Sequence, residues 1–207
     1  MSKTLLIVDD HPIICGAITA ALERNGYTVV ATSTDGVDAL LKIRTLSPEY
    51  LLLDIGLDGL DGLSVLQRLN SENIKIKTLV FTSQAAGIYA ARCMQAGASG
   101  FINKSATMDE LIKGFDAIND GYLYFPREAL DQYVEHGFGS ELDAKKLTNK
   151  EIIILQLLVQ GLSNVAIGEQ LFLSHKTVSG HKINILRKLG VRTTIELASV
   201  AKEMNLI

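Results

Sequence analysis

The sequence has only two cysteines, no long apolar run and no internal repeat, and each shortage excludes a class of protein. Cys15 and Cys93 lie far apart without the spacing of metal ligands, so we expect two reduced thiols on helices rather than a disulfide or a zinc site. No apolar run approaches the ~18–20 residues that a membrane-spanning helix needs. The apolar part of MSKTLLIVDD is also too short for the core of a signal peptide. We therefore expect a cytoplasmic protein that does not enter a membrane.

The charge of the chain is unevenly distributed. Hydrophobic residues make up 47% of the 207 residues and charged residues 21%, which argues against disorder. Residues 1–125 hold 10 Lys/Arg and 14 Asp/Glu, and residues 126–143 hold 1 and 5, so each segment carries −4. Residues 144–207 hold 9 and 4, which gives +5. A basic surplus in the last third suits contact with a polyanion, and a solvated basic face is the alternative.

The first 125 residues alternate between apolar, β-branched runs and amphipathic segments. We predict strands at 4–10, 27–33, 50–55, 78–83 and 100–104. Pro12 occupies a first-turn position, Gly26 and Gly97 stand where helices end, and Thr107-x-x-Glu110 is a capping box. Five βα units predict a parallel sheet that is covered by helices on both faces and has right-handed crossovers.

Periodicity fades between residues 121 and 146, where Pro, Gly and acidic residues accumulate. We therefore divide the chain into a first domain at 1–125, a linker at 126–143 and a second domain at 144–207. The linker has room for one short helix around 127–136.

The second domain has the pattern of four short helices. Thr148-x-x-Glu151 caps the first, Ser174 caps the third, and Gly190 ends it. Two short helices joined by a tight turn, the second of them rich in small polar and basic residues, indicate a helix-turn-helix.

Charged and polar residues end several of the predicted strands. They are Asp9 and Asp10 after the first, Asp54 after the third, Thr82 in the fourth and Lys104 after the fifth. In an open parallel sheet these ends converge on the ligand-binding edge. Three crowded carboxylates need a cation to stay ionised, and Mg²⁺ prefers oxygen ligands of this kind. A carboxylate nucleophile, a metal, a lysine and a hydroxyl together indicate phosphoryl transfer.

The motifs that carry these residues resemble two known domains. LLIVDDHP, LLLDIGLDGLDG, LVFTS and GASGFINKS are similar, in order and spacing, to the signatures of a response-regulator receiver domain. Residues 147–191 are similar to the LuxR-type helix-turn-helix. Together they resemble a response regulator of the NarL/FixJ type, closest to the BvgA/EvgA branch. The resemblance implies a flavodoxin-like α/β receiver with sheet order 2-1-3-4-5, followed by a small all-α domain.

The resemblance also implies roles for the residues at the strand ends. Asp54 would be the phosphoacceptor, served by a sensor histidine kinase or a phosphotransfer domain. Asp10, Asp54 and the carbonyl of Gly56 would hold Mg²⁺ directly, with Asp9 acting through water. Gly56 has no side chain to orient a hydrolytic water, so we expect slow loss of the phosphoryl group, although Gln84 could still orient one.

Three further residues are expected to respond to the phosphoryl group. Lys104 would pair with it, Thr82 would swing towards its oxygen, and Phe101 would turn inward. Each has a purely structural alternative: a solvated lysine, a β-branched strand residue and a buried core aromatic, respectively.

For the recognition helix, the family pattern implies contacts with double-stranded promoter DNA. The candidate residues are Lys176, Thr177, Ser179, Gly180, His181, Lys182, Ile183, Asn184 and Lys188. Val178 should pack inward, Ile183 can touch a thymine methyl group, and the mid-helix Gly180 costs ~1 kcal/mol relative to alanine. Gly168 stands where the family usually has alanine, which we interpret as a packing change.

These patterns predict a phosphorylation-controlled transcriptional regulator that forms a homodimer when phosphorylated, with no catalysis beyond its own phosphorylation and dephosphorylation. A haloacid-dehalogenase-like phosphohydrolase is the enzymatic alternative, but its second aspartate would be at position 56, which is glycine. A nucleotide-binding loop would need G-x-G-x-x-G, whereas the chain has G-x-x-G-x-x-G. A third alternative retains DNA binding but makes the receiver a phosphorylation-independent dimerisation module.

Overall fold

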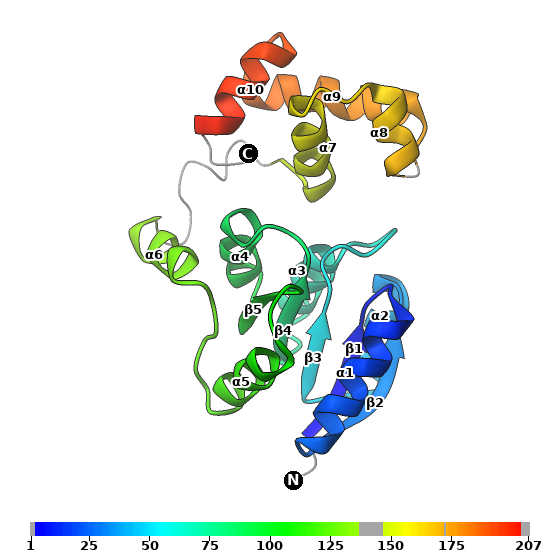
Figure 1. The fold of residues 1–207 in the computed structure, drawn as a ribbon, viewed down its shortest axis with the longest axis vertical. Helices are drawn as coiled ribbons and strands as arrows, with labels where there is room; N and C mark the ends of the chain where they lie inside the picture. The colour runs from blue at the N-terminus through cyan, green and yellow to red at the C-terminus, as the bar shows by residue number, and fades with distance from the viewer. Residues whose placement is uncertain (1–2, 137–146, 172, 204–207) are drawn as a thin grey trace. The chain divides into compact units, whose positions relative to one another are not determined.

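The computed structural model describes residues 3–136, 147–171 and 173–203, and the chain divides into two compact units, Met1–Glu135 and His136–Ile207. The first unit contains a parallel sheet in the order β2-β1-β3-β4-β5 (Figure 1). Its strands are β1 (Lys3–Val8), β2 (Tyr27–Ser33), β3 (Tyr50–Leu53), β4 (Lys77–Thr82) and β5 (Gly100–Asn103). This order confirms the predicted fold class.

The register of the sheet brings the polar ends of its strands to one edge. Val8 of β1 pairs with Leu53 of β3, and Leu53 pairs with Val80 of β4. Every residue of β3 is buried, as expected for a strand covered on both faces. Asp9 and Asp54 therefore follow neighbouring strands at equivalent positions.

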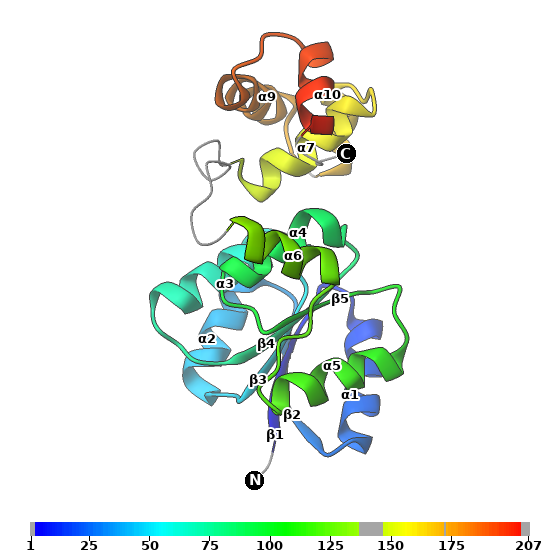
Figure 2. The same ribbon diagram turned by 90° about the vertical axis from the view of Figure 1, so that its left-hand side faces the viewer.

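Helices cover both faces of this sheet (Figure 2). They are α1 (Pro12–Arg24), α2 (Gly36–Leu46), α3 (Gly62–Ser71), α4 (Ala86–Gln95) and α5 (Met108–Asn119). Helices α1 and α5 lie on one face, where Ile18, Leu22 and Phe115 form a core with Leu5 and Leu52 of the sheet. Helices α2, α3 and α4 lie on the other.

The predicted helix boundaries are confirmed by backbone geometry. Pro12 is at the first helical position of α1, and Gly26 and Gly97 follow helices with φ of +83° and +97°. Thr107 and Glu110 form a reciprocal capping box at α5. Both cysteines are free and buried in helices, as expected for reduced thiols.

The second unit consists of four helices: α7 (Asn149–Val159), α8 (Asn164–Gln170), α9 (His175–Leu189) and α10 (Thr194–Glu203). Helix α9 packs against the other three. Val178, Ile185 and Leu189 form its buried face, so Val178 packs inward as predicted. The side chain of Ser174 caps its N-terminus, and Gly190 ends it with a φ of +70°. Helices α8 and α9 form the predicted helix-turn-helix.

The expected short helix between the domains is present as α6 (Arg127–His136). The rest of the predicted linker, from residue 137, lies outside the described residues. The preceding segment pairs with the edge of the sheet, because Phe101 donates a backbone hydrogen bond to Tyr124 (2.8 Å) and Tyr124 donates one to Ser99 (3.0 Å). Of the helices that the structure describes, none combines the length and apolarity needed to cross a membrane.

Candidate functional site

Asp54 lies at the carboxyl end of β3 and is 5% exposed. Its backbone N–H donates to the carbonyl of Val8 (2.8 Å), which fixes the residue against β1. Its carboxylate accepts from two donors: the Gly56 N–H bonds Oδ1 (2.8 Å), and the Lys104 ammonium bonds Oδ2 (2.5 Å). The carboxylate is therefore held in one orientation by a loop amide and a cation.

Lys104 joins the two buried carboxylates. Its Nζ lies 2.7 Å from Oδ2 of Asp9 as well as 2.5 Å from Oδ2 of Asp54. Burial alone would lower the pKa of Lys104, but its hydrogen bonds to Asp54 and Asp9 outweigh that effect and raise the pKa above its ordinary value. Its backbone N–H donates to the carbonyl of Thr82 (2.8 Å), so β4 fixes the start of the lysine side chain.

Asp10, next to Asp9 in the chain, has a buried carboxylate oxygen that no described donor satisfies. Oδ1 of Asp10 is buried and accepts no hydrogen bond from any residue that the structure describes, although Nδ1 of His11 lies 2.6 Å away in unfavourable geometry. The backbone N–H of His11 donates to Oδ1 of Asp9 (2.9 Å). Asp9, Asp10 and His11 each offer a ligand atom within 4.8 Å of the others, whereas Asp54 is joined to Asp9 through Lys104. The carboxylate oxygens of Asp9 and Asp10 suit a hard divalent cation, which would also satisfy the buried Oδ1 of Asp10.

Thr82 and Phe101 are both inside the protein. Thr82 is fully buried, and its Oγ1 accepts from the backbone N–H of Gln84 (3.3 Å). Phe101 is 2% exposed. The Phe101 ring is therefore already buried in this conformation, so an inward turn would not begin from an exposed ring. Its burial is what the core-aromatic alternative describes.

Two glycines that the sequence interpretation did not single out, Gly36 and Gly62, allow the loop after Asp54 to pack closely against the backbone. A Cβ on Gly62 would overlap the carbonyl oxygen of Asp54, and a Cβ on Gly36 would overlap that of Leu60. Asp61 caps α3 by accepting from the Ser64 N–H (3.1 Å). The D-G pairs of this segment are typical of a turn, but the close approach of the loop backbone depends on tertiary packing.

In the second unit, the predicted DNA-binding residues lie along α9 with different exposures. Lys176, Thr177, Gly180, Ile183 and Asn184 are exposed, whereas Ser179, His181, Lys182 and Lys188 are half-buried. The exposed residues recur at helical spacing and form one face.

Lys188 points away from that face. Its ammonium lies 2.7 Å from Oε2 of Glu151, a buried carboxylate that also accepts from the Thr148 N–H (2.6 Å). Burial raises the pKa of Glu151, but the hydrogen bonds from Lys188 and Thr148 outweigh it and leave the pKa below its ordinary value. Arg187, which the sequence interpretation omitted, is exposed and donates to Oδ1 of Asn184 (3.3 Å). Val178, Ile185 and Leu189 mark the buried side of α9. The helical spacing from these residues could have shown that Arg187 is exposed and that Lys188 lies nearer to the buried side.

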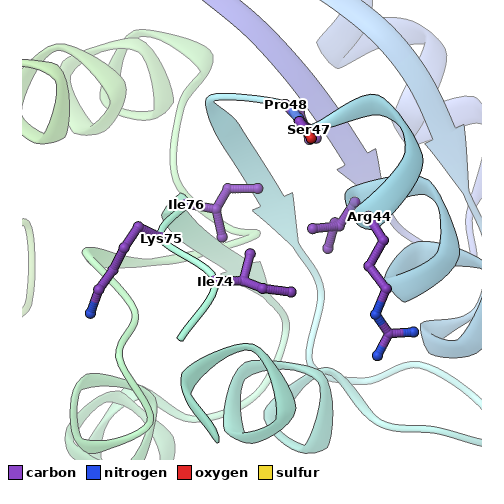
Figure 3. Close-up of a pocket in the computed structure, with 7 residues that line it drawn as sticks. Arg44, Ser47, Pro48, Ile74, Lys75 and Ile76 are labelled. Carbon is purple, nitrogen blue, oxygen red and sulfur yellow. The ribbon is translucent and has the colours of Figure 1, made fainter. Parts of the chain in front are cut away.

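A cavity of about 340 Å³ lies at the opposite, amino-terminal edge of the sheet (Figure 3). Its wall includes Pro48 before β3 and Ile74 and Ile76 before β4. Arg44 beside it is paired with Glu72 (2.6 Å). None of the predicted site residues lines this cavity.

Two family matches cover most of the chain. Residues 5–116 match the family described as response regulator receiver domain. Residues 145–201 match the family described as bacterial regulatory proteins, luxR family. The boundary between the matches falls in the region that connects the two structural units.

The chain aligns with known relatives over nearly their whole length. The chain is 38% identical to the virulence-factor transcription regulator BvgA of Bordetella pertussis over the whole of both chains. It is 29% identical to the DNA-binding transcriptional activator EvgA of Escherichia coli, over 95% of this chain and 96% of the relative. A solved complex of the two-component response regulator RcsB with DNA matches with 25% identity and a TM-score of 0.58, covering 96% of this chain and 97% of that one.

Proposed function

Because the chain belongs to the NarL/FixJ family of response regulators, which are phosphorylation-controlled transcription regulators, we propose that Asp54 is its phosphoacceptor. The observation that carries the proposal is the Asp54 carboxylate, buried at a strand end and held between the Gly56 N–H and the Lys104 ammonium. The donor is a sensor histidine kinase or a phosphotransfer domain. Its phosphohistidine loses the P–N bond as a carboxylate oxygen of Asp54 forms the new P–O bond.

The residues around Asp54 prepare this transfer. Asp9, Asp10, Asp54 and the Gly56 carbonyl would hold Mg²⁺, which neutralises charge on the phosphoryl oxygens when it is bound. Lys104 already carries its charge beside Asp54, so it can move from the carboxylate to a phosphoryl oxygen without leaving the site. The buried Thr82 hydroxyl, which accepts a 3.3 Å hydrogen bond from the Gln84 N–H, would lose that bond as it turns towards the same group.

Phosphorylation then promotes dimerisation and promoter binding. The receiver comprises residues 1–125, the linker 126–143 and the DNA-binding domain 144–207. The exposed face of α9 enters the major groove of double-stranded DNA, where Lys176, Thr177 and the N-terminal backbone amides contact phosphates. Lys188 supports this helix from behind through Glu151.

The chain does not act as an enzyme on other substrates in this proposal. Gly56 offers no side chain to position a hydrolytic water, which supports slow loss of the phosphoryl group from Asp54. Release of inorganic phosphate from the purified phosphoprotein over time measures this rate, and a Gln84→Ala variant tests whether the Gln84 side-chain amide contributes.

The central test is phosphorylation by acetyl phosphate with and without Mg²⁺, followed by intact-mass measurement of the parent and Asp54→Asn. We expect one metal-dependent phosphoryl adduct on the parent and none on the variant, with stronger self-association and DNA retention of the adduct. Asp58→Asn is the matched control, because Asp58 is on the same loop outside the proposed site. Lack of an adduct on metal-loaded parent protein would leave the receiver as a dimerisation module and remove the role of Asp54.

A further inference from the structure

The cavity at the amino-terminal edge of the sheet lies where α2 ends. Ser47 adopts a left-handed conformation after α2 (φ +47°), and Pro48 follows it, so the chain turns at once into β3. The cavity has an apolar wall of Ile43, Pro48, Ile74 and Ile76, of which the last two are only half-buried. Its volume of about 340 Å³ is within the range of small-molecule sites, ~300–1,000 Å³. The cavity is therefore large enough for a small ligand with an apolar part.

The charged residues that line this cavity are both cations. Arg44, in the last turn of α2, and Lys75, just before β4, are among the seven lining residues, and none of the seven is acidic. Figure 3 shows the two side chains on either side of Ile74. The charge of the lining therefore favours an anionic ligand over a neutral or cationic one.

The partner of Arg44 indicates which anion fits. Nε of Arg44 donates to Oε2 of Glu72 (3.1 Å) and Nη2 donates to Oε1 (2.6 Å), so the guanidinium binds a carboxylate through two hydrogen bonds. Glu72 follows α3 and is not among the residues that line the cavity. The two side chains are 49% and 39% exposed, and ion pairs of such exposure contribute little to stability. Another carboxylate can therefore replace that of Glu72 at small cost.

The shape of the lining indicates the rest of the ligand. Figure 3 shows Arg44 opposite Ile74, with its guanidinium directed away from Ser47 and Pro48. A ligand whose carboxylate binds the guanidinium can therefore extend its tail past Ile74 towards Pro48. Three of the lining residues are isoleucines and none is aromatic, so an aliphatic tail matches the apolar wall.

We propose that this cavity binds a small aliphatic monocarboxylate, whose tail packs against the apolar wall and whose carboxylate replaces that of Glu72 on Arg44. Lys75 adds a second positive charge at the rim. Occupancy releases Glu72 and so removes the ion pair that joins α2 to the end of α3. The site is at the edge of the sheet opposite Asp54, so it is independent of the proposed phosphoacceptor and of DNA binding.

The test titrates the full-length, nitrogen-15-labelled protein with sodium octanoate and follows its amide proton–nitrogen correlation spectrum. Octanol has the tail without the charge, and acetate has the charge without the tail. We expect octanoate to cause saturable changes at residues 43–47 and 74–76 and to bind about tenfold more tightly than octanol, because Arg44 binds the carboxylate. From butanoate to octanoate, each added CH₂ should tighten binding about fourfold until the cavity is filled.

Two variants break the same ion pair and should change binding in opposite directions. Arg44→Gln removes the carboxylate partner, so octanoate should bind no better than octanol. Glu72→Gln removes the competing carboxylate, so octanoate should bind about two- to fivefold more tightly than to the parent. Arg24→Gln is the matched control, because Arg24 is an exposed arginine in the last turn of α1. Thermal unfolding of each variant verifies that the fold is retained.

A site for aliphatic acids requires the opposite effects of Arg44→Gln and Glu72→Gln, with spectral changes at the lining residues. Equal binding of octanoate and octanol by the parent, or equal effects of the two variants, would overturn the proposal. Affinity that continues to rise through dodecanoate would show adsorption to an open apolar surface and would also overturn it. Saturable changes elsewhere in the chain, or no saturable binding by any acid of the series, would have the same consequence.

Discussion

The carboxyl edge of the sheet, with Asp9, Asp54 and Lys104, and the exposed face of α9 are built in opposite ways. At the carboxyl edge of the sheet, Asp9, Asp54 and Lys104 each follow a different strand. The two carboxylates are buried, and both are already paired with Lys104, whose side chain is 10% exposed. On α9, the exposed residues come from one helix, and Arg187 contacts Asn184 there through an exposed 3.3 Å hydrogen bond. Buried charges must be paired within the protein to offset the cost of their desolvation. Exposed polar side chains can remain hydrated until they contact a binding partner. Substitutions should therefore affect stability at the first and binding at the second.

The largest effect should come from Lys104→Ala, because it leaves Asp9 and Asp54 buried without their shared cation. Removing one partner of a buried pair costs about 3–5 kcal/mol. We expect the free energy of unfolding, measured by urea denaturation, to fall by this order without metal and to recover in part with Mg²⁺. The exposed Lys75→Ala is the control and should change it by no more than about 0.5 kcal/mol. Equal stability of the two variants would show that the pair is not the stabilising feature.

Gly62→Ala should have the next largest effect, because the new Cβ overlaps the Asp54 carbonyl. Overpacking of this kind costs about 1–3 kcal/mol, and the displaced backbone should also slow phosphorylation by acetyl phosphate. Gly16→Ala is a matched control in α1, where a Cβ meets no described atom within 4 Å and alanine should stabilise the helix by about 1 kcal/mol. Unchanged stability and phosphorylation of Gly62→Ala would mean that the loop adjusts without moving Asp54.

Glu151→Gln should weaken the second unit by about 1–2 kcal/mol at neutral pH, allowing for the partial exposure of Lys188. The pKa of Glu151 is depressed in the folded chain, so its contribution is complete above the ordinary value of 4.5 and disappears as pH falls through the folded value. The difference in unfolding free energy between the parent and the variant should therefore shrink on acidification. A difference that stays constant from pH 7 to pH 3 would exclude the charged pair as its source.

The smallest effect on stability is expected on the exposed face of α9. Asn184→Ala removes the exposed 3.3 Å contact with Arg187, so the free energy of unfolding should remain within about 0.5 kcal/mol of the parent value. DNA affinity should fall, as electrophoretic mobility shift with a duplex that the parent protein binds would measure. A large loss of stability would mean that this face is structural, which would remove the contrast between the two regions.

The two regions also differ in how well the sequence predicts them. Asp9, Asp54 and Lys104 were predictable because parallel strands bring their carboxyl ends to one edge, whatever the details of packing. Lys188 and Arg187 are neighbours in sequence, and the helical phase set by the inward Val178 separates them, but the pairing of Lys188 with Glu151, 37 positions earlier, is a tertiary contact that the sequence does not reveal. The close approach of Gly62 to the Asp54 carbonyl was not predictable either, because it depends on how the loop between them folds back.

The pairing of Tyr124 with the edge of β5 bears on how the first unit can be handled as a separate protein. The backbone N–H of Phe101 and the carbonyl of Ser99 would otherwise be open hydrogen-bonding groups on an edge strand, which are templates for aggregation. Gly100 permits this cover, because a Cβ there would lie 2.9 Å from the Tyr124 carbonyl oxygen. A fragment that ends at the last turn of α5 would therefore expose the unpaired edge of β5 and be prone to aggregation. A fragment that continues through Pro126 would keep the segment around Tyr124 that covers this edge.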